Sequence, residues 1–329
     1  MPEYRRDLVS GEWVIMAPER AKRPHELWKN IPKRQKSPKA GCPFEDLKKT
    51  GNWPPIISFP ADKNWEVMVL PNKYPAVAHL NTCAIDIKNG PYEVKSGIGA
   101  HDVVLLRDHN KPLADLTLRQ ATNVLLIMRD RYRMLAGDPC LSYVIGIHNW
   151  GPTVGASLYH PHLQILTLPI VPYLVKRSLH GSHAYFEKNK RCAHCEIISY
   201  EKKYKKRIVA ENRGAIAVCP FVSWREYEVR IFPKQHQSNF EDSAPTDLKY
   251  VADVLQRVLK MIRRNLHDPD LNFYLHSAPL KDKERHYHWH IEIIPNVPPT
   301  PAGFELGTGV EITTADPDLA ASVLRGRKK

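Results

Sequence analysis

The sequence predicts an α+β protein built from two copies of one unit, and three observations support this. A His-x-His-x-Gln motif at 160–164 returns as His-x-His-x-Glu at 288–292, a separation of 128 residues. Both motifs alternate polar with apolar side chains, which is typical of a strand with one buried face. The preceding segments match too: a histidine-containing turn, an amphipathic helical segment (118–135 and 246–265) and a short apolar segment occur in the same order. Such matching indicates an internal repeat.

The boundary between the two copies is expected near 170–190. Pro169 and Pro172 interrupt the pattern there, and a weakly patterned run containing Lys and Arg follows. We therefore expect a first half at 1–175 and a second half at 176–329, although the same stretch is compatible with a helix that joins them. A length of 329 residues with 43% hydrophobic residues suits two domains of ordinary size.

Charge and hydropathy narrow the function classes. No apolar segment reaches the roughly eighteen residues of a membrane span, and Met1 leads into Arg5-Arg6-Asp7 instead of a secretory signal. We therefore expect a cytoplasmic protein with no membrane partner. The net charge of +13 suits a phosphate-rich small substrate and would also suit nucleic acid. Because the Lys and Arg runs lack interleaved aromatic residues, we interpret them as solvated surface and do not favour nucleic acid.

The motif at 160–164 carries the predicted chemistry. On a strand, His160, His162 and Gln164 would lie side by side on one face, opposite the apolar Leu163 and Ile165. Imidazole is a good nucleophile toward phosphorus, and a glutamine can bind a phosphate oxygen or hold the ring in one tautomer. One histidine on the wet face of a strand would need no function, but three polar residues in register, present twice, favour nucleotidyl transfer through histidine.

The second half contains a candidate zinc site. Cys192 and Cys195 form a C-x-x-C pair, and disulfides are not expected in a cytosolic chain. Two thiolates need two further ligands for a tetrahedral site, and His236 and His288 are the natural completion. His194 and His286 are interpreted as bystanders, although either could substitute as a ligand. A redox role for the pair is less favoured, because the sequence gives little sign of a thioredoxin-like strand-to-helix setting.

By the repeat, the first half should own an equivalent site at Cys42, Glu45, His109 and His160. Its second position is a glutamate where the other half has a cysteine. A carboxylate can bind zinc, but the softer two-thiolate arrangement is lost. This site is therefore expected to be weaker or empty, and Cys42 could equally be a small buried apolar residue.

These motifs resemble the galactose-1-phosphate uridylyltransferase branch of the histidine-triad superfamily over almost the whole chain. The opening segment with Arg20 and Arg23 is similar to the family's arginines that contact the nucleotide and phosphates, and Asn72 to its asparagine near the nucleoside. The segment before His160 resembles the phosphate-binding segment of the family, with Asn149, Gly155 and Ser157.

The resemblance implies two histidine-triad-like halves, each an antiparallel sheet flanked by helices, in a zinc-containing homodimer. It also implies a ping-pong reaction in which His162 attacks the α-phosphorus of a UDP-sugar and a second sugar 1-phosphate accepts the uridylyl group. Gln164, Ser157 and the backbone near Gly155 would meet the phosphoryl charge. His160 would hold zinc or, without metal, be fixed by hydrogen bonds.

Two departures bear on the substrate. In the second motif, His290 and Glu292 replace the nucleophile and glutamine, and a carboxylate repels a phosphate, so this copy is expected to be structural. Near the C-terminus, Thr308 and Gly309 stand where galactose enzymes of the family place a tyrosine and a glutamate, and the ending resembles relatives that act on ADP-glucose. The expected activity is UDP-glucose:hexose-1-phosphate uridylyltransferase. The alternatives are an ADP-glucose or related nucleotide phosphorylase or hydrolase, and a metal-holding nucleotide- or nucleic-acid-binding protein.

Overall fold

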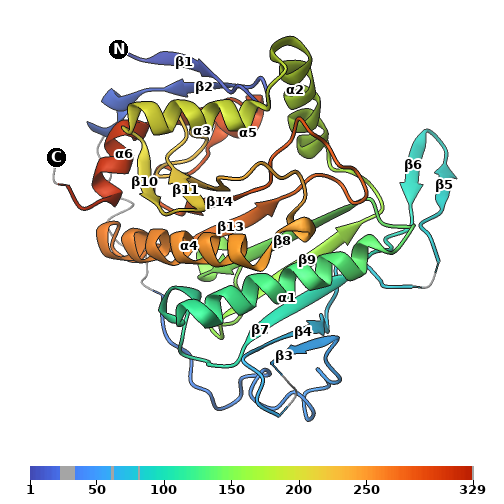
Figure 1. Ribbon diagram of the computed structural model, residues 1–329. Coiled ribbons are helices and arrows are strands. Elements are labelled where there is room, and N and C mark those ends of the chain that lie inside the picture. Colours follow the sequence, from blue (N-terminus) through green and yellow to red (C-terminus); the bar gives the residue numbers. More distant parts are fainter. Residues whose placement is uncertain (23–33, 61–62, 81, 328–329) are drawn as a thin grey trace.

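The computed structural model describes residues 1–22, 34–60, 63–80 and 82–327, and one continuous antiparallel sheet organises them (Figure 1). Across this sheet the strands are β10 (Ile208–Glu211), β11 (Ala215–Val218), β12 (Val229–Pro233), β14 (His290–Pro295), β13 (Leu271–His276), β8 (Tyr143–Trp150), β9 (His162–Leu168), β7 (His101–Leu106), β4 (Val67–Pro71) and β3 (Ile57–Phe59). The predicted α+β fold with antiparallel sheets is confirmed.

The strand order repeats on either side of a central junction, where β8 pairs with β13. Outward from that junction, the order β8, β9, β7, β4, β3 corresponds to β13, β14, β12, β11, β10. The two histidine motifs therefore occupy equivalent strands, β9 and β14. The proposed division at 175/176 falls inside helix α2 (Tyr173–Asn189) and stays a prediction, while the sheet itself runs through both halves.

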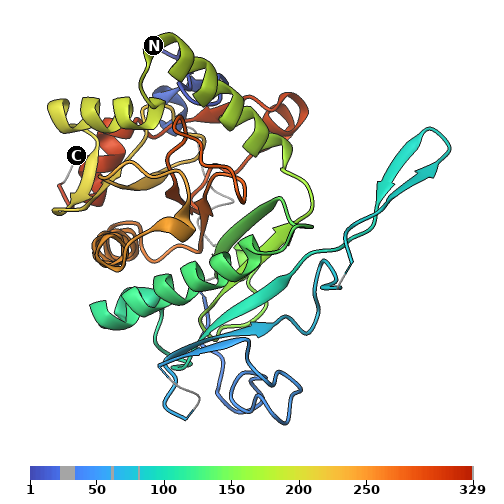
Figure 2. The same ribbon diagram turned by 45° about the vertical axis from the view of Figure 1, so that its right-hand side comes forward.

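Two long helices cover one face of the sheet, as Figures 1 and 2 show: α1 (Leu118–Ala136) and α4 (Pro245–Asn265). Helix α1 begins at a capping box, in which the Thr117 hydroxyl accepts the Gln120 N–H and the Gln120 side chain accepts the Thr117 N–H. The apolar stripe of each helix packs on the alternate strand residues, among them Leu163 and Ile291. The helices thus leave the opposite face to His162 and Gln164.

Close packing explains one glycine in this layer. A Cβ atom on Gly146 of β8 would lie 2.6 Å from Met128 Cε and 3.1 Å from the Tyr132 hydroxyl. Real Cβ atoms do not approach other heavy atoms so closely, so the buried Met128 side chain, or α1 itself, would have to shift. Glycine at this position therefore permits the helix to seat directly behind the strand that leads to His162.

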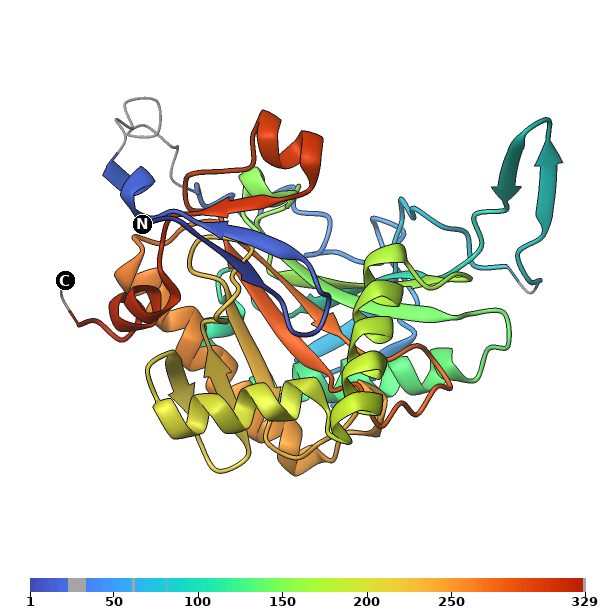
Figure 3. The same ribbon diagram turned by 90° about the horizontal axis from the view of Figure 1, so that it is seen from above.

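The opposite face is covered differently in the two halves. In the second half, α3 (Ala193–Tyr204) lies on β11 and β12 through Ile198 and Phe232. A small sheet of β1 (Glu3–Arg6), β2 (Trp13–Met16) and β15 (Glu311–Thr313) lies beside it and joins the two ends of the chain, as Figure 3 shows. In the first half, the described residues that pack there belong to irregular segments and include Phe44, Leu47 and Trp65.

Further elements complete the fold, and of these α6 (Pro317–Leu324) packs into the main core through Ala320, Ala321 and Leu324. Among the described residues, the others are the 3-10 helices η1 (Pro18–Lys22), η3 (Leu113–Asp115), η4 (Pro152–Val154) and η5 (Phe240–Asp242), the hairpin of β5 (Asp86–Asn89) and β6 (Tyr92–Lys95), and α5 (Gly303–Thr308). The hairpin projects from the body in Figures 1 and 2. At its base Cys83 is disulfide-bonded to Cys140, contrary to the expectation from the sequence, because the chain brings the two Cα atoms to 4.8 Å. No helix among the described residues is long and apolar enough to cross a membrane.

Candidate active site and metal clusters

His162 is the first residue of β9 and is 9% exposed. Its Nδ1–H donates to the backbone oxygen of His160 at 2.8 Å. A carbonyl only accepts, so Nδ1 carries the proton and Nε2 keeps its lone pair. Burial lowers the pKa of His162, which favours the neutral ring. The site therefore contains a neutral imidazole whose Nδ1 is hydrogen-bonded and whose Nε2 has no hydrogen-bond partner among the described residues.

His160 lies outside the strand, which corrects one detail of the sequence-based expectation. The strand begins at His162, so only His162 and Gln164 share its face. The His160 ring turns toward the end of β7, where its Nε2–H donates to the Leu106 oxygen at 2.7 Å. The first histidine of the motif therefore joins a cluster of potential metal ligands.

This first cluster brings together the four residues that the repeat predicted: Cys42, Glu45, His109 and His160. The Nδ1 atoms of the two histidines are 3.2 Å apart, and Cys42 Sγ is 3.6 Å from His160 Nδ1. Glu45 Oε1 lies 3.3 Å from His109 Nδ1 and 3.5 Å from His160 Nδ1. Each Nε2 donates to a carbonyl, so two unprotonated nitrogens face each other and repel unless a cation lies between them.

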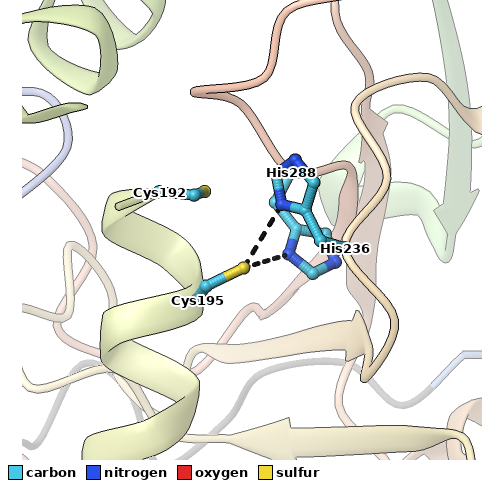
Figure 4. Close-up of side chains that lie close together, drawn as sticks. All are labelled: Cys192, Cys195, His236 and His288. Atoms are coloured by element: carbon cyan, nitrogen blue, oxygen red, sulfur yellow. Dashed lines mark hydrogen bonds between the residues drawn. The ribbon is translucent and has the colours of Figure 1, made fainter. Parts of the chain in front are cut away.

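The second cluster, drawn in Figure 4, brings together Cys192, Cys195, His236 and His288. Cys195 Sγ is 3.2 Å from His236 Nδ1 and 3.5 Å from His288 Nδ1, and one ligand atom from each residue lies within 4.8 Å of the others. A hydrogen bond from the Cys195 thiol lowers the pKa of Cys192, and burial lowers that of His288 to about 3. Thiolate and neutral imidazole are the forms that bind zinc.

The neighbouring His194 and His286 are not among the four clustered ligands, although His194 is close enough to Cys192 to help lower the pKa of that thiol. The His194 ring lies 5.0 Å from that of His290, and His286 Nδ1 is 3.1 Å from Glu284 Oε2. The thiol pair itself sits at the start of α3, with Cys192 as N-cap residue and Cys195 in the first turn. Two cysteines on one helical turn thus face two histidines (Figure 4): His236 lies in the loop after β12, and His288 in the loop between β13 and β14.

Asn149 lies near the end of β8, and Gly155 and Ser157 lie on the segment that connects β8 with His160. Gly155 adopts φ +92°, which favours glycine, and a Cβ atom there would be 3.4 Å from Asn149 Nδ2. Ser157 is exposed. Arg20 is exposed on η1 and, among the described residues, makes no side-chain contact with this segment. Arg23 lies outside the described residues.

The second half holds this connecting segment in place, which the sequence did not predict. Asn272 Nδ2 on β13 donates to Asn149 Oδ1 at 2.8 Å and to the Val154 oxygen at 3.0 Å. Asp270 accepts from the Thr153 backbone N–H and hydroxyl at 3.0 and 2.7 Å. Polar residues at the start of β13 were the only available signal, and their partners depend on the pairing of β13 with β8.

Gln164 is half-buried, and its Oε1 lies 2.7 Å from His101 Nε2. His101 Nε2 is also 3.0 Å from Asn72 Nδ2. The structure therefore places a histidine that sequence reasoning missed between two predicted site residues. A polar residue at the start of the apolar strand 101–106 was the signal for it.

In the second half, the position that corresponds to Gln164 is Glu292, and charged side chains surround it. Arg230 Nε lies 2.8 Å from Glu228 Oε1 and 3.4 Å from Glu292 Oε2, while the Tyr274 hydroxyl donates to Glu292 Oε1 at 2.7 Å. Burial alone would raise the pKa of Glu292, but Arg230 and its other partners lower it to about 2. His290 stacks on His276 with ring centres 4.7 Å apart.

Comparisons with known proteins agree with this geometry. Residues 1–172 match the model described as galactose-1-phosphate uridyl transferase, N-terminal domain. An ADP-glucose phosphorylase from Arabidopsis thaliana is 32% identical over 98% of this chain and 92% of its own length. A galactose-1-phosphate uridylyltransferase from Thermotoga maritima is 26% identical over 99% of this chain and 98% of its own.

Solved structures extend the likeness to three dimensions. The crystal structure of an ADP-glucose phosphorylase from Arabidopsis thaliana with bound ADP-glucose has a TM-score of 0.85 at 29% identity and covers 100% of both chains. A uridylyltransferase structure has a TM-score of 0.77 at 28% identity and covers 99% of this chain and 98% of the other. The fold and these matches define an enzyme of nucleotidyl transfer. The chain belongs to the galactose-1-phosphate uridylyltransferase family, as its motifs predicted.

Proposed function

We propose that the protein transfers a nucleotidyl group through His162 and that ADP-glucose phosphorylase is the activity best supported. The observation that carries the first part is a neutral, buried imidazole whose Nε2 has no hydrogen-bond partner among the described residues. Identity of 32% over 98% of the chain to an ADP-glucose phosphorylase supports the second part. The replacement of the family's tyrosine and glutamate by Thr308 and Gly309 agrees with a sugar other than galactose.

In the first step, His162 Nε2 attacks the α-phosphorus of ADP-glucose. The N–P bond forms as the bond to the bridging oxygen breaks, and glucose 1-phosphate leaves with that oxygen and its electron pair. Positive charge then spreads over the ring, and the Nδ1–H bond to the His160 oxygen stabilises it. No proton has to be removed from the nucleophile, because Nε2 is already bare.

In the second step, an oxygen of inorganic phosphate attacks the same phosphorus from the side that glucose 1-phosphate left. The N–P bond breaks, His162 recovers its lone pair and ADP is released. Two in-line displacements at one phosphorus let a single set of groups bind both the leaving and the entering phosphate. Asn149, Ser157, Gln164 and the backbone at Gly155 are proposed for this set, with Arg20, Arg23 and Asn72 toward the nucleotide.

Both ligand clusters are proposed as structural zinc sites. The set Cys192, Cys195, His236 and His288 fits tetrahedral zinc, and Cys42, Glu45, His109 and His160 offer the harder set expected to bind it more weakly. A bound zinc would cross-link its ligands and supply no reacting atom. In the first half, His160 would then hold the backbone oxygen that orients His162. A cytoplasmic homodimer is proposed from the family alone.

A second candidate activity is UDP-glucose:hexose-1-phosphate uridylyltransferase. It is favoured by the 26% identity to the Thermotoga maritima enzyme over nearly the full length of both chains. The chemistry at His162 would be the same, with a sugar 1-phosphate in place of inorganic phosphate as acceptor. The two candidates therefore differ in base, sugar and acceptor, and not in the nucleophile.

A crossed substrate panel tests this proposal. ADP-glucose and UDP-glucose would each be combined with inorganic phosphate or galactose 1-phosphate, and release of sugar 1-phosphate would be measured. We expect turnover for ADP-glucose with phosphate, at a rate at least tenfold above any other pair. Fastest turnover of UDP-glucose with galactose 1-phosphate would replace the first candidate by the second. Binding without turnover of any pair would leave only a nucleotide-binding protein.

A further inference from the structure

His101 lies on the same face of the sheet as the proposed nucleophile. It begins β7, and the register of β7 with β9 pairs Val103 with Gln164 and Leu105 with His162. Because side chains alternate along a strand, His101 projects on the side of Val103 and Leu105, next to Gln164. It is half-buried and belongs to neither metal cluster.

The contacts of His101 fix its tautomer. The Ala76 backbone N–H donates to Nδ1 at 3.0 Å, so Nδ1 is unprotonated and the proton of the neutral ring is on Nε2. That Nε2–H points to Gln164 Oε1 at 2.7 Å. The ring thus accepts from the loop after β4 and donates to the strand of the nucleophile.

A fixed tautomer decides which way the Gln164 amide faces. A glutamine amide can turn by 180° and exchange its acceptor oxygen with its donor nitrogen at little cost. With Oε1 occupied by His101, the NH₂ group is left for another partner. A phosphoryl oxygen only accepts, so this is the orientation that can stabilise charge on the transferred phosphate.

The same ring also holds the loop that is proposed to meet the nucleoside, through the Ala76 N–H that donates to Nδ1. Asn72 Oδ1 accepts the Tyr74 N–H at 2.9 Å, which places Asn72 Nδ2 3.0 Å from His101 Nε2. Because that ring nitrogen already carries a proton, it cannot accept from Asn72, whose amide hydrogens remain available to a ligand. We infer that His101 is a positioning residue that presents the amide donor of Gln164 to the phosphate of the bound nucleotide.

This inference rests on the proposed function, and rapid-quench labelling of His162 with α-labelled ADP-glucose and UDP-glucose tests both separately. His101→Phe keeps a ring but no hydrogen bond, and we expect it to slow formation of labelled enzyme roughly 10- to 100-fold. His101→Gln, whose amide can donate where Nε2 did, should recover most of the rate. If wild-type protein takes no label from either sugar nucleotide, the proposed function is wrong. If wild type is labelled and His101→Phe is labelled equally fast, the positioning role is wrong.

A double-mutant cycle separates positioning from general support of the fold. If His101 acts through Gln164, then Gln164→Ala and the double variant His101→Phe, Gln164→Ala should be labelled at similar rates. Rate losses that multiply would overturn the inference. Unchanged melting and metal content serve as controls. Should His101→Phe not fold, His101→Asn takes its place in both experiments. The shorter asparagine side chain can accept the Ala76 N–H as Nδ1 does, but it cannot reach Gln164 as Nε2 does.

Discussion

The two halves of the sheet have the same strand order but differ in what stands around the second histidine of each motif. Beside His162, the register pairs Gln164 with Val103; beside His290, it pairs Glu292 with Arg230. The first position is neutral and half open, whereas the second is a buried ion pair that also involves Glu228. The carboxylates of Glu228 and Glu292 beside Arg230 would repel a phosphate, so the same strand order supports a reactive site in one half and a buried ionic cluster in the other.

The largest expected effect concerns the two histidines. His162→Ala should reduce nucleotidyl exchange at least a thousandfold, because no other group can form the N–P bond. His290→Ala should keep exchange within about threefold of wild type while lowering the melting temperature, because it removes a buried stacking partner of His276. Steady-state exchange and thermal melting would be measured on both. Equal loss of exchange in the two variants would contradict the asymmetry between the halves.

The next largest effect is expected when the ligands of the two metal clusters are replaced. Cys195→Ser should release metal from the second cluster and lower the melting temperature by on the order of 10 °C, because binding energy there is also folding energy. Cys42→Ser should release less metal and lower melting less, since its cluster has one thiolate. The converse substitution, Glu45→Cys, gives the first cluster a second thiolate and should raise its affinity for zinc. Metal analysis that finds the first cluster tighter than the second in wild type would reverse this order.

Prediction from the sequence succeeded where residues act through local spacing. Strand alternation predicted that His162 and Gln164 share one face. The repeat predicted Glu45 as a member of the first cluster, and in the structure Glu45 Oε1 lies 3.3 Å from His109 Nδ1. It failed where the partner depends on register between distant strands. Neither the pairing of Glu292 with Arg230 nor that of Asn149 with Asn272 follows from local pattern, because both depend on which strands become neighbours.

A smaller effect is expected from substitutions in the buried ionic cluster of Arg230, Glu228 and Glu292. Glu292→Gln should lower the free energy of unfolding by roughly 2–4 kcal/mol, because Arg230 loses one of its buried counter-charges. Tyr274→Phe removes only a neutral donor to the same carboxylate, and about 1 kcal/mol is expected. Chemical denaturation would measure both. A Glu292→Gln variant as stable as wild type would show that the charge of Glu292 does not contribute.

The smallest effect concerns His148, which stands on β8 where the second half has Leu275. Its Nδ1–H donates to the His162 oxygen, and burial lowers its pKa to about 4. Unfolding lets this ring bind a proton below pH 6.5, so its contribution is complete above that pH and is lost as the pH falls toward 4. Wild type should lose about 2 kcal/mol more than His148→Asn between pH 7 and pH 5. Parallel pH profiles would show that His148 titrates alike in both states.

The central claim is that His162 carries the nucleotide between two displacements, and mass spectrometry of protein quenched during turnover tests it most directly. Digestion under alkaline conditions, where a phosphoramidate survives, should yield a peptide containing His162 with the added mass of one nucleoside monophosphate, and an unmodified peptide containing His290. An unmodified His162 peptide under conditions of rapid exchange would contradict the account.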